Sequence, residues 1–259
     1  MRKIILGDCL KVMERIKDKS IDMILCDLPY GKTACEWDVI IPANLLWNQY
    51  KRIIKDNGVI ALTASQPFTS MLVMSNLKMF RYEWIWLKGR GQNFASAKKQ
   101  FMRAHESILI FYSKQPVYNP QMTEALKENI RKVYYEGDAK YNSKVYKSNV
   151  YGVQRKASED YDPTKRYPLS YGLYKIGRSR DKIHPTQKPV ALFEYFIKTY
   201  TNEGDLVLDN CAGSGTTGIA CINLKRNFIL IDNERKYYDM MRKRIKKAYI
   251  KSKQEEKRA

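Results

Sequence analysis

Short apolar runs alternate with longer amphipathic segments along most of the chain, and this alternation predicts strands and helices in turn. The run 21–26 is apolar at nearly every position, which is typical of a strand buried on both faces of a sheet. Further strands are expected at 3–6, 58–62, 81–87, 107–112, 206–209 and 228–232, with helices at 9–16, 42–54, 67–77, 189–200, 219–224 and from 234 onward. The predicted fold class is therefore α/β, a doubly wound and mostly parallel sheet with helices on both faces.

The pattern breaks between 113 and 183, where the chain is polar, basic and rich in tyrosine. A loop of this length is unusual in a compact domain, so we expect a separate small module or a segment ordered by its partner. A flexible insertion without a role is the alternative. The sequence thus divides into an α/β half at 1–112, an insertion at 113–183, a second α/β half at 184–250 and a basic, frayed tail at 251–259.

The charge of the chain narrows the choice of partner. Its 47 lysines and arginines against 27 acids give a formal net charge of +20, which favours a polyanion such as nucleic acid; a solvated basic surface is the alternative. No apolar run is long enough to cross a membrane and no signal peptide precedes the first strand, so we expect a cytoplasmic protein without a membrane partner. Five cysteines without a C-x-x-C pair, and only two histidines, predict neither disulfides nor a metal site.

Asp27, Leu28, Pro29 and Tyr30 follow the buried run 21–26, at the strand end where open α/β sheets bind ligands. They offer a carboxylate, backbone carbonyl oxygens in a turn that Pro29 keeps extended, and a flat aromatic ring. An exocyclic amino group on a planar base needs these partners, which are acceptors for its hydrogens and a surface for stacking. Taken alone, the tetrapeptide is also compatible with an ordinary turn.

A second motif lies near the other end of the chain. Gly213, Gly215 and Gly218 form G-x-G-x-x-G between a predicted strand and a helix, and Asp232 ends the next strand. The pattern fits a nicotinamide or flavin enzyme, but a dinucleotide fold needs further βαβ units after this one. Only one strand and one helix remain, whereas the missing strands stand at the N-terminus. The order indicates a nucleotide-type sheet that is circularly permuted.

Taken together, the two motifs resemble the β-type amino-methylating DNA methyltransferases, whose catalytic D-P-P-Y precedes the F-x-G-x-G of their S-adenosyl-L-methionine (AdoMet) site. The resemblance covers nearly everything outside 113–183. Further matches are Gly7-Asp8, Arg103-Ala104-His105-Glu106 and His184-Pro185-Thr186-Gln187-Lys188-Pro189. It implies a catalytic N-terminal half, a target-recognition insertion at 113–183 and an AdoMet-binding C-terminal half.

The resemblance also implies roles for individual residues. Asp27, Leu28, Pro29 and Tyr30 would be catalytic: the Asp27 carboxylate and the Leu28 carbonyl would accept from the target amine, and Tyr30 would stack on the flipped base. The implied cofactor contacts are Asp8 at the adenine, Asp232 at the ribose, Lys188 at the carboxylate, and Asp209, Gly213, Gly215 and Thr216 in the loop. From their place in a loop on the catalytic side, and not from the resemblance, Lys88, Arg90 and Asn93 are expected at DNA phosphates; His105, near a strand start, either faces DNA or is structural.

Two positions depart from the family pattern. Leu28 replaces a proline, although its carbonyl oxygen is the same, and Cys211 replaces an aromatic residue that contacts the cofactor. The leading hypothesis is methylation of adenine N6 in double-stranded DNA, because a leading aspartate leans toward adenine. The alternatives are cytosine N4, a NAD-dependent oxidoreductase and a catalytically silent DNA-binding protein. A homodimer, a restriction-modification role and a cognate restriction endonuclease are left open by the sequence.

Overall fold

The structure is a computed structural model that describes residues 1–33, 35–125, 146–148, 152–154, 162, 164–177 and 187–257. It divides into two compact units, one made of Met1–Asn119 with Leu169–Ala259 and the other of Pro120–Pro168. The larger unit holds nearly all the predicted α/β pattern, so it is the unit that forms the site.

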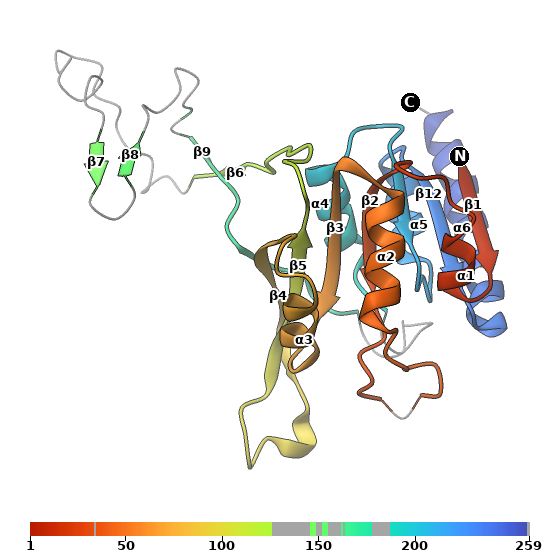
Figure 1. The fold of residues 1–259 in the computed structure, drawn as a ribbon, viewed down its shortest axis with the longest axis horizontal. Coiled ribbons are helices and arrows are strands. Elements are labelled where there is room, and N and C mark those ends of the chain that lie inside the picture. The colour runs from red at the N-terminus through yellow and green to blue at the C-terminus, as the bar shows by residue number, and fades with distance from the viewer. Residues whose placement is uncertain are drawn as a thin grey trace. The chain divides into compact units, whose positions relative to one another are not determined.

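Eight strands form the sheet of the larger unit, within the described residues, in the order β1-β12-β11-β2-β3-β5-β4-β10 (Figure 1). Their bounds are β1 Arg2–Leu6, β2 Ile21–Asp27, β3 Ile54–Ala64, β4 Phe80–Gln92, β5 Arg103–Phe111, β10 Tyr171–Leu173, β11 Leu206–Asp209 and β12 Asn227–Asp232. Only β5 runs antiparallel to its neighbours β3 and β4. The expected mostly parallel α/β sheet is confirmed.

Helices cover both faces of this sheet. Contacts join α4 (Val190–Tyr200), α5 (Thr216–Asn223) and α6 (Arg235–Glu256) over one face, and α1 (Cys9–Met13), α2 (Ala43–Ile53) and α3 (Phe68–Ser75) over the other. Successive side chains of β2 enter two separate cores: Met23 and Leu25 pack with the first helix group, Ile24 and Cys26 with the second. All four are fully buried, which explains the uninterrupted apolar run.

The chain order of the sheet creates a topological switch point between β11 and β2. From β11 the chain passes through α5 to β12 on one side, and from β2 through α2 to β3 on the other. Strands β11 and β2 pair in parallel, so their carboxyl ends lie at the same edge of the sheet. Asp27 ends β2 and the glycine loop follows β11, which brings the two sequence motifs to the place where such sheets bind ligands.

The insertion and the tail differ from their expected limits. The smaller unit spans Pro120–Pro168 and is shorter than the expected insertion at 113–183. Tyr171–Leu173, which the sequence analysis placed in the insertion, pair with Ile85–Leu87 of the main sheet as strand β10. Within the smaller unit β6 (Thr123–Glu124) pairs with β9 (Lys165–Arg166), and β7 (Tyr146–Ser148) with β8 (Gly152–Gln154). Helix α6 continues to Glu256, so most of the basic tail is helical. Among the described residues, no helix is long and apolar enough to span a membrane.

Candidate active site

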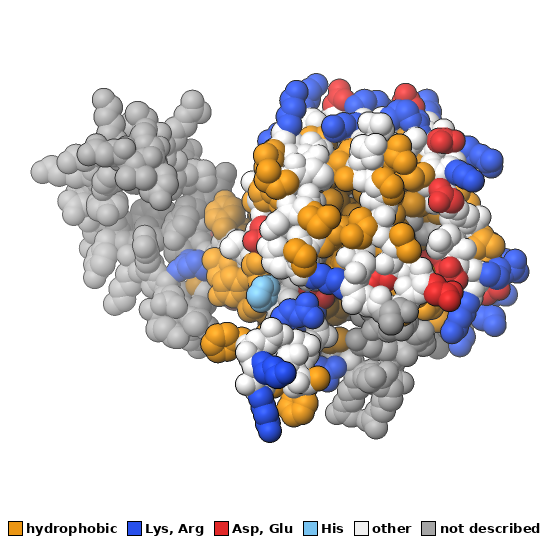
Figure 2. Space-filling view, turned by 60° about the horizontal axis from the view of Figure 1, so that its bottom comes forward, with side chains coloured by type: hydrophobic (Ala, Val, Ile, Leu, Met, Phe, Trp, Pro, Cys, Tyr) orange, Lys and Arg blue, Asp and Glu red, His pale blue; other side chains and the backbone are white. Residues whose placement is uncertain are grey.

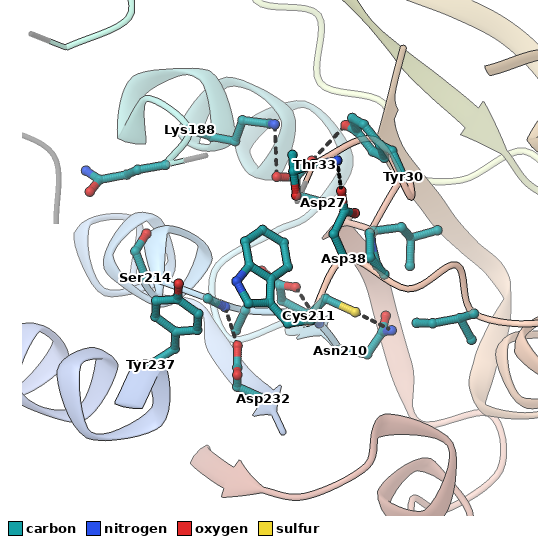
Figure 3. Close-up of a pocket in the computed structure, with 18 of the residues that line it drawn as sticks. Asp27, Tyr30, Thr33, Asp38, Lys188, Asn210, Cys211, Ser214, Asp232 and Tyr237 are labelled. Atoms are coloured by element: carbon teal, nitrogen blue, oxygen red, sulfur yellow. Dashed lines mark hydrogen bonds and ion pairs between the residues drawn. The ribbon is translucent and has the colours of Figure 1, made fainter. Parts of the chain in front are cut away.

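A cavity of about 610 Å³ opens at the switch point of the sheet. Its wall includes most of the residues that the sequence singled out, and Figure 3 shows how several of them converge. The predicted residues that line it are Asp8, Asp27, Leu28, Pro29, Tyr30, Lys88, His105, Lys188, Asp209, Gly213, Thr216 and Asp232. The tetrapeptide and the glycine loop therefore share one cavity.

The carboxylate of Asp27 is held on both of its oxygens. Oδ1 accepts hydrogen bonds from the Tyr30 hydroxyl at 2.8 Å and from the Thr63 hydroxyl, and Oδ2 lies 2.9 Å from Nζ of Lys188. Burial, and next the negative charge of Asp27, raises the pKa of Tyr30 well above its ordinary value, so the phenol stays a hydrogen-bond donor. Phe68 stacks on the Tyr30 ring with centroids 5.2 Å apart, and Nζ of Lys188 lies 5.7 Å from the centroid of the same ring.

Lys188 belongs to a chain of alternating charges beneath Asp27. Its Nζ also lies 3.2 Å from Oε2 of Glu106, whose Oε1 lies 2.5 Å from Nζ of Lys88. Burial disfavours the charge on Lys188, but Asp27 and Glu106 outweigh it and raise the pKa of this ammonium group. Burial likewise opposes ionisation of Glu106, yet Lys188 and Lys88 lower its pKa. Two anions and two cations thus balance inside the protein.

Asp232 holds the glycine loop in place at the other end of the cavity. Its Oδ2 accepts from the backbone N–H of Gly213 at 2.7 Å and its Oδ1 from that of Glu234 at 2.9 Å. Figure 3 shows Asp232 beside the loop. Gly213 has φ of +46°, in the left-handed region that favours glycine. Gly215 lies outside the cavity wall; a Cβ on it would come within 2.7 Å of the Met241 side chain. Close packing against α6 thus accounts for the second glycine of the motif.

Asp209 and Thr216 support the loop from below. Burial raises the pKa of Asp209 to about 7, while hydrogen bonds from the Thr217 hydroxyl and the Cys211 backbone N–H act in the opposite direction. The Thr216 hydroxyl donates to the Lys188 carbonyl at 3.4 Å and accepts from Arg244 at 3.3 Å. Arg244, which the sequence analysis missed, also donates to the Ser214 carbonyl at 2.9 Å.

The loop after Tyr30 adds two features that the sequence analysis missed. The carboxylate of Asp38 accepts from the backbone N–H groups of Gly31, Lys32 and Thr33 at 2.7–2.9 Å, which fixes the turn. The ring of its neighbour Trp37 meets Tyr237 of α6 edge-on, with centroids 6.1 Å apart. Both rings line the cavity, as does Cys211, the position where the family pattern has an aromatic residue.

Two of the predicted residues, Lys88 and Lys188, have partners other than those expected. Lys88 was assigned to a DNA phosphate by its place in the sequence, but its side chain is 4% exposed and its ammonium group is bound by Glu106 and Gln92. Arg90 and Asn93 lie on a hairpin outside the cavity wall, and His105 is exposed at its rim. Lys188, assigned to a cofactor carboxylate, is bound to Asp27 and Glu106. The His184–Thr186 part of its motif lies outside the described residues.

Thr63 and Glu106 are the other site residues to which the sequence analysis gave no role. Thr63 reaches Asp27 because β3 pairs with β2 in a register that sets Thr63 opposite Asp27. Glu106 faces Trp86 across the β4–β5 ladder. No group of His, Cys, Asp or Glu side chains suited to a metal ion exists among the residues that the structure describes.

Comparison with known proteins agrees with this geometry. A family model described as DNA methylase, for N6 and N4 methyltransferases, matches residues 21–243. The Type II methyltransferase M.HpaI of Haemophilus parainfluenzae is 28% identical over 94% of this chain and 74% of its own length. The Type II methyltransferase M2.MboI of Moraxella bovis is 27% identical over 92% of this chain and 85% of its own.

Solved structures share the fold. The complex of M1.HpyAVI with SAM superposes with a TM-score of 0.62 at 24% identity, covering 95% of this chain and 99% of that one. The cytosine-N4-specific PvuII DNA methyltransferase gives a TM-score of 0.63 at 15% identity, covering 96% and 91%. The matched segment takes in both motifs and the sheet between them, which favours the methyltransferase interpretation of the glycine loop over the nicotinamide one. The chain belongs to the N6/N4 DNA methylase family.

Proposed function

We propose that this protein transfers a methyl group from AdoMet to the N6 amine of adenine in double-stranded DNA. The observation that carries the proposal is the single cavity that joins the Asp27 carboxylate to the glycine loop and Asp232. Its volume of about 610 Å³ lies within the usual range of ligand sites, roughly 300–1,000 Å³. The net charge of +20 supports a DNA substrate.

The residues around Gly213 fit AdoMet. Asp232 is 8% exposed and turns its carboxylate toward the loop, where it can accept from ribose hydroxyls while its backbone partners hold it still. Trp37 and Tyr237 offer aromatic surface for the adenine ring, in place of the aromatic residue absent at Cys211. Asp8 also lines the cavity, although its Oδ1 already caps α1 by accepting from Lys11 at 3.0 Å. When bound, AdoMet supplies an electrophilic methyl group.

The residues around Asp27 fit the other substrate. The lone pair of an exocyclic amine is delocalised into the base, which makes the amine a weak nucleophile. Acceptance of its hydrogens by Asp27 and by the Leu28 carbonyl localises that pair and aims it at the methyl group. The ion pair with Lys188 holds the Asp27 carboxylate in one orientation, so this acceptor is in position before the base arrives. Tyr30, with Phe68 on one face, presents the other to the base.

The DNA surface is proposed on similar grounds. Arg90, Asn93 and His105 lie on or beside the hairpin of β4 and β5, next to the cavity, and are suited to contact the backbone of the substrate. Lys88 is not suited to contact DNA, because its side chain is buried and paired with Glu106. We assign target recognition to the 113–183 insertion. The likeness to the Type II methyltransferases M.HpaI and M2.MboI supports a role in restriction-modification.

The proposal is tested by incubating the protein with unmethylated genomic DNA and isotopically labelled AdoMet, followed by mass spectrometry of the digested nucleosides. Label in N6-methyldeoxyadenosine supports the proposal. Label in N4-methyldeoxycytidine would mean that the target base is cytosine and not adenine, with the same residues at the site. Asp27→Asn, assayed in parallel, shows whether the label depends on this site.

A further inference from the structure

The hairpin of β4 and β5 carries a tip that begins at the mouth of the cavity. Gln92 and Arg103 form the last register pair before the tip, and both line the cavity wall. Residues 93–102 therefore extend outward from the rim, and Figure 1 shows this long hairpin projecting beyond the sheet.

Two aromatic side chains on this tip are exposed. Phe101 is 99% exposed and Phe94 is 84% exposed. The backbone beneath them is held, because Met102 packs so closely on Gly91 that a Cβ there would lie 2.7 Å from the Met102 Cβ. The short helix Phe94–Ser96 also shapes the tip, preceded by Asn93 at φ of +71°. An ordered turn that presents a large apolar ring to water points to a partner that covers it.

The positive charge around Phe94 and Phe101 favours a polyanionic partner. No aspartate or glutamate occurs between Lys88 and Arg103, whereas Arg90, Lys98, Lys99 and Arg103 all carry exposed positive charge. Figure 2, which views the side from which the hairpin projects, shows blue and orange side chains mixed on it. Cations around an exposed ring suit DNA, since cations bind phosphates while an apolar wedge can enter a base step.

The position of Asp27 indicates what an exposed ring on the tip could do. Its carboxylate is 19% exposed at the end of β2, so a base can reach it only after leaving the duplex. A nucleotide that leaves the stack exposes the faces of its neighbours, and a ring placed between them replaces the lost stacking. We propose that residues 93–102 form a DNA-inserting wedge and that the ring of Phe101 occupies the place of the flipped target nucleotide. This inference rests on the proposed function for its target base only.

The test compares Phe101→Ala with the wild type on two duplexes that contain the methylated site, once sequencing has located it. One duplex is fully paired, and the other has an abasic site opposite the target, so that flipping is already inexpensive. Phe101→Ala is expected to slow methylation of the paired duplex by about tenfold or more and of the other by less than about threefold, because only the first needs the wedge. Phe101→Leu should retain most activity, since leucine also serves as a wedge.

A fluorescent base analogue at the target position gives a second readout, because its emission rises when it leaves the stack. The rise is expected with wild type and to be lost with Phe101→Ala. Ile250→Ala is the matched control: Ile250 is an exposed apolar residue near the carboxyl end of α6, away from the cavity, and its removal should change neither readout.

Three results would overturn the inference. Equal losses on both duplexes would assign Phe101 to general DNA binding, and unchanged rates and fluorescence would leave it without a role in flipping. A change of oligomeric state in light scattering would assign the tip to contact with a second copy of the chain. Wild-type methylation of the same duplexes reports on the proposed function separately, so the failure of one is distinct from that of the other.

Discussion

Nζ of Lys188 lies 2.9 Å from Oδ2 of Asp27, so the carboxylate that ends β2 is paired with a cation that precedes α4 near the other end of the chain. Both side chains are largely buried, and the pair continues through Glu106 to Lys88. Removal of one member of a buried pair leaves an uncompensated charge, whereas a chain of four balanced charges keeps each partner in place. The network fixes Asp27 before substrate arrives. It also requires the burial of the Lys88 ammonium group, which carries a desolvation cost.

Replacement of Asp27 should separate chemistry from DNA binding. Asp27→Ala is expected to abolish methyl transfer and Asp27→Asn to lower kcat by roughly 10²–10³-fold, because the amine loses a charged acceptor. DNA affinity should stay within a few-fold, since the role proposed for Asp27 at the end of β2 is to act on the amine and not on the phosphates. Tritium transfer from labelled AdoMet and filter binding measure the two effects.

Glu106→Gln is the matched control for Asp27→Asn. It removes one negative charge from the same network, but its side chain contacts Lys88 and Lys188 rather than the position proposed for the base. Its loss of kcat is expected to be smaller than that of Asp27→Asn. Near-normal turnover in a folded Asp27 variant would remove Asp27 from the mechanism.

Sequence pattern was sufficient for the sheet apart from β10 and for the two strand ends. A parallel strand buried on both faces is apolar throughout, and its carboxyl end is where ligands bind. The ion network could not be predicted from the sequence. The antiparallel β4–β5 register sets Glu106 opposite Trp86, and the same ladder buries Lys88, which looks in sequence like any loop cation. Trp37 and Tyr237 meet only after α6 packs on the sheet, and nothing in their local sequence pairs them.

Asp232→Ala is expected to weaken AdoMet binding chiefly, with little effect on DNA affinity. Two ribose hydroxyls would lose a charged acceptor worth roughly 1.5–3 kcal/mol per bond. The Gly213 and Glu234 N–H groups would lose theirs as well. Calorimetric titration with AdoMet measures the loss, and Asp232→Asn shows how much of it depends on charge. An unchanged cofactor affinity in Asp232→Ala would argue against the ribose contact.

Trp37→Ala is also expected to weaken AdoMet binding, by about 1–3 kcal/mol if the indole stacks on adenine. Tyr237→Phe keeps the ring that meets Trp37 and removes only a hydroxyl, so it should bind more nearly like the wild type. Equilibrium dialysis with labelled AdoMet compares the two variants. Equal affinity of Trp37→Ala and wild type would mean that no adenine stacks on this ring.

The stability of the protein should depend on the protonation of Asp209. Burial raises the pKa of this carboxyl from 3.8 to about 7, so between these values the folded state holds a proton that the unfolded state has released. Its contribution to the free energy of unfolding must then fall as pH rises through this window, by at most about 1.4 kcal/mol per pH unit. Asp209→Asn has no such proton, and its amide can donate to the Thr217 hydroxyl that now donates to Asp209.

Denaturant unfolding of the wild type and Asp209→Asn at several pH values between 5 and 8 measures this effect. The stability of wild type relative to the variant is expected to decrease with rising pH up to about 7. Above that pH the difference becomes constant, because the carboxyl is then ionised in the folded state as well. Parallel curves for the two proteins would show that Asp209 titrates alike in the folded and unfolded states.

The 113–183 insertion should determine which site is methylated. Base-edge contacts specify sequence, whereas phosphate contacts mainly position the protein. If the insertion reads bases, its exchange for the equivalent segment of a relative such as M2.MboI should change the methylated site and leave the chemistry at Asp27 intact. If it only adds positive charge, the exchange should alter affinity and salt dependence without moving the site. Single-molecule sequencing of DNA from cells that express the chimera gives the answer. An active chimera that keeps the original site would transfer specificity to the basic hairpin of β4 and β5 beside the cavity.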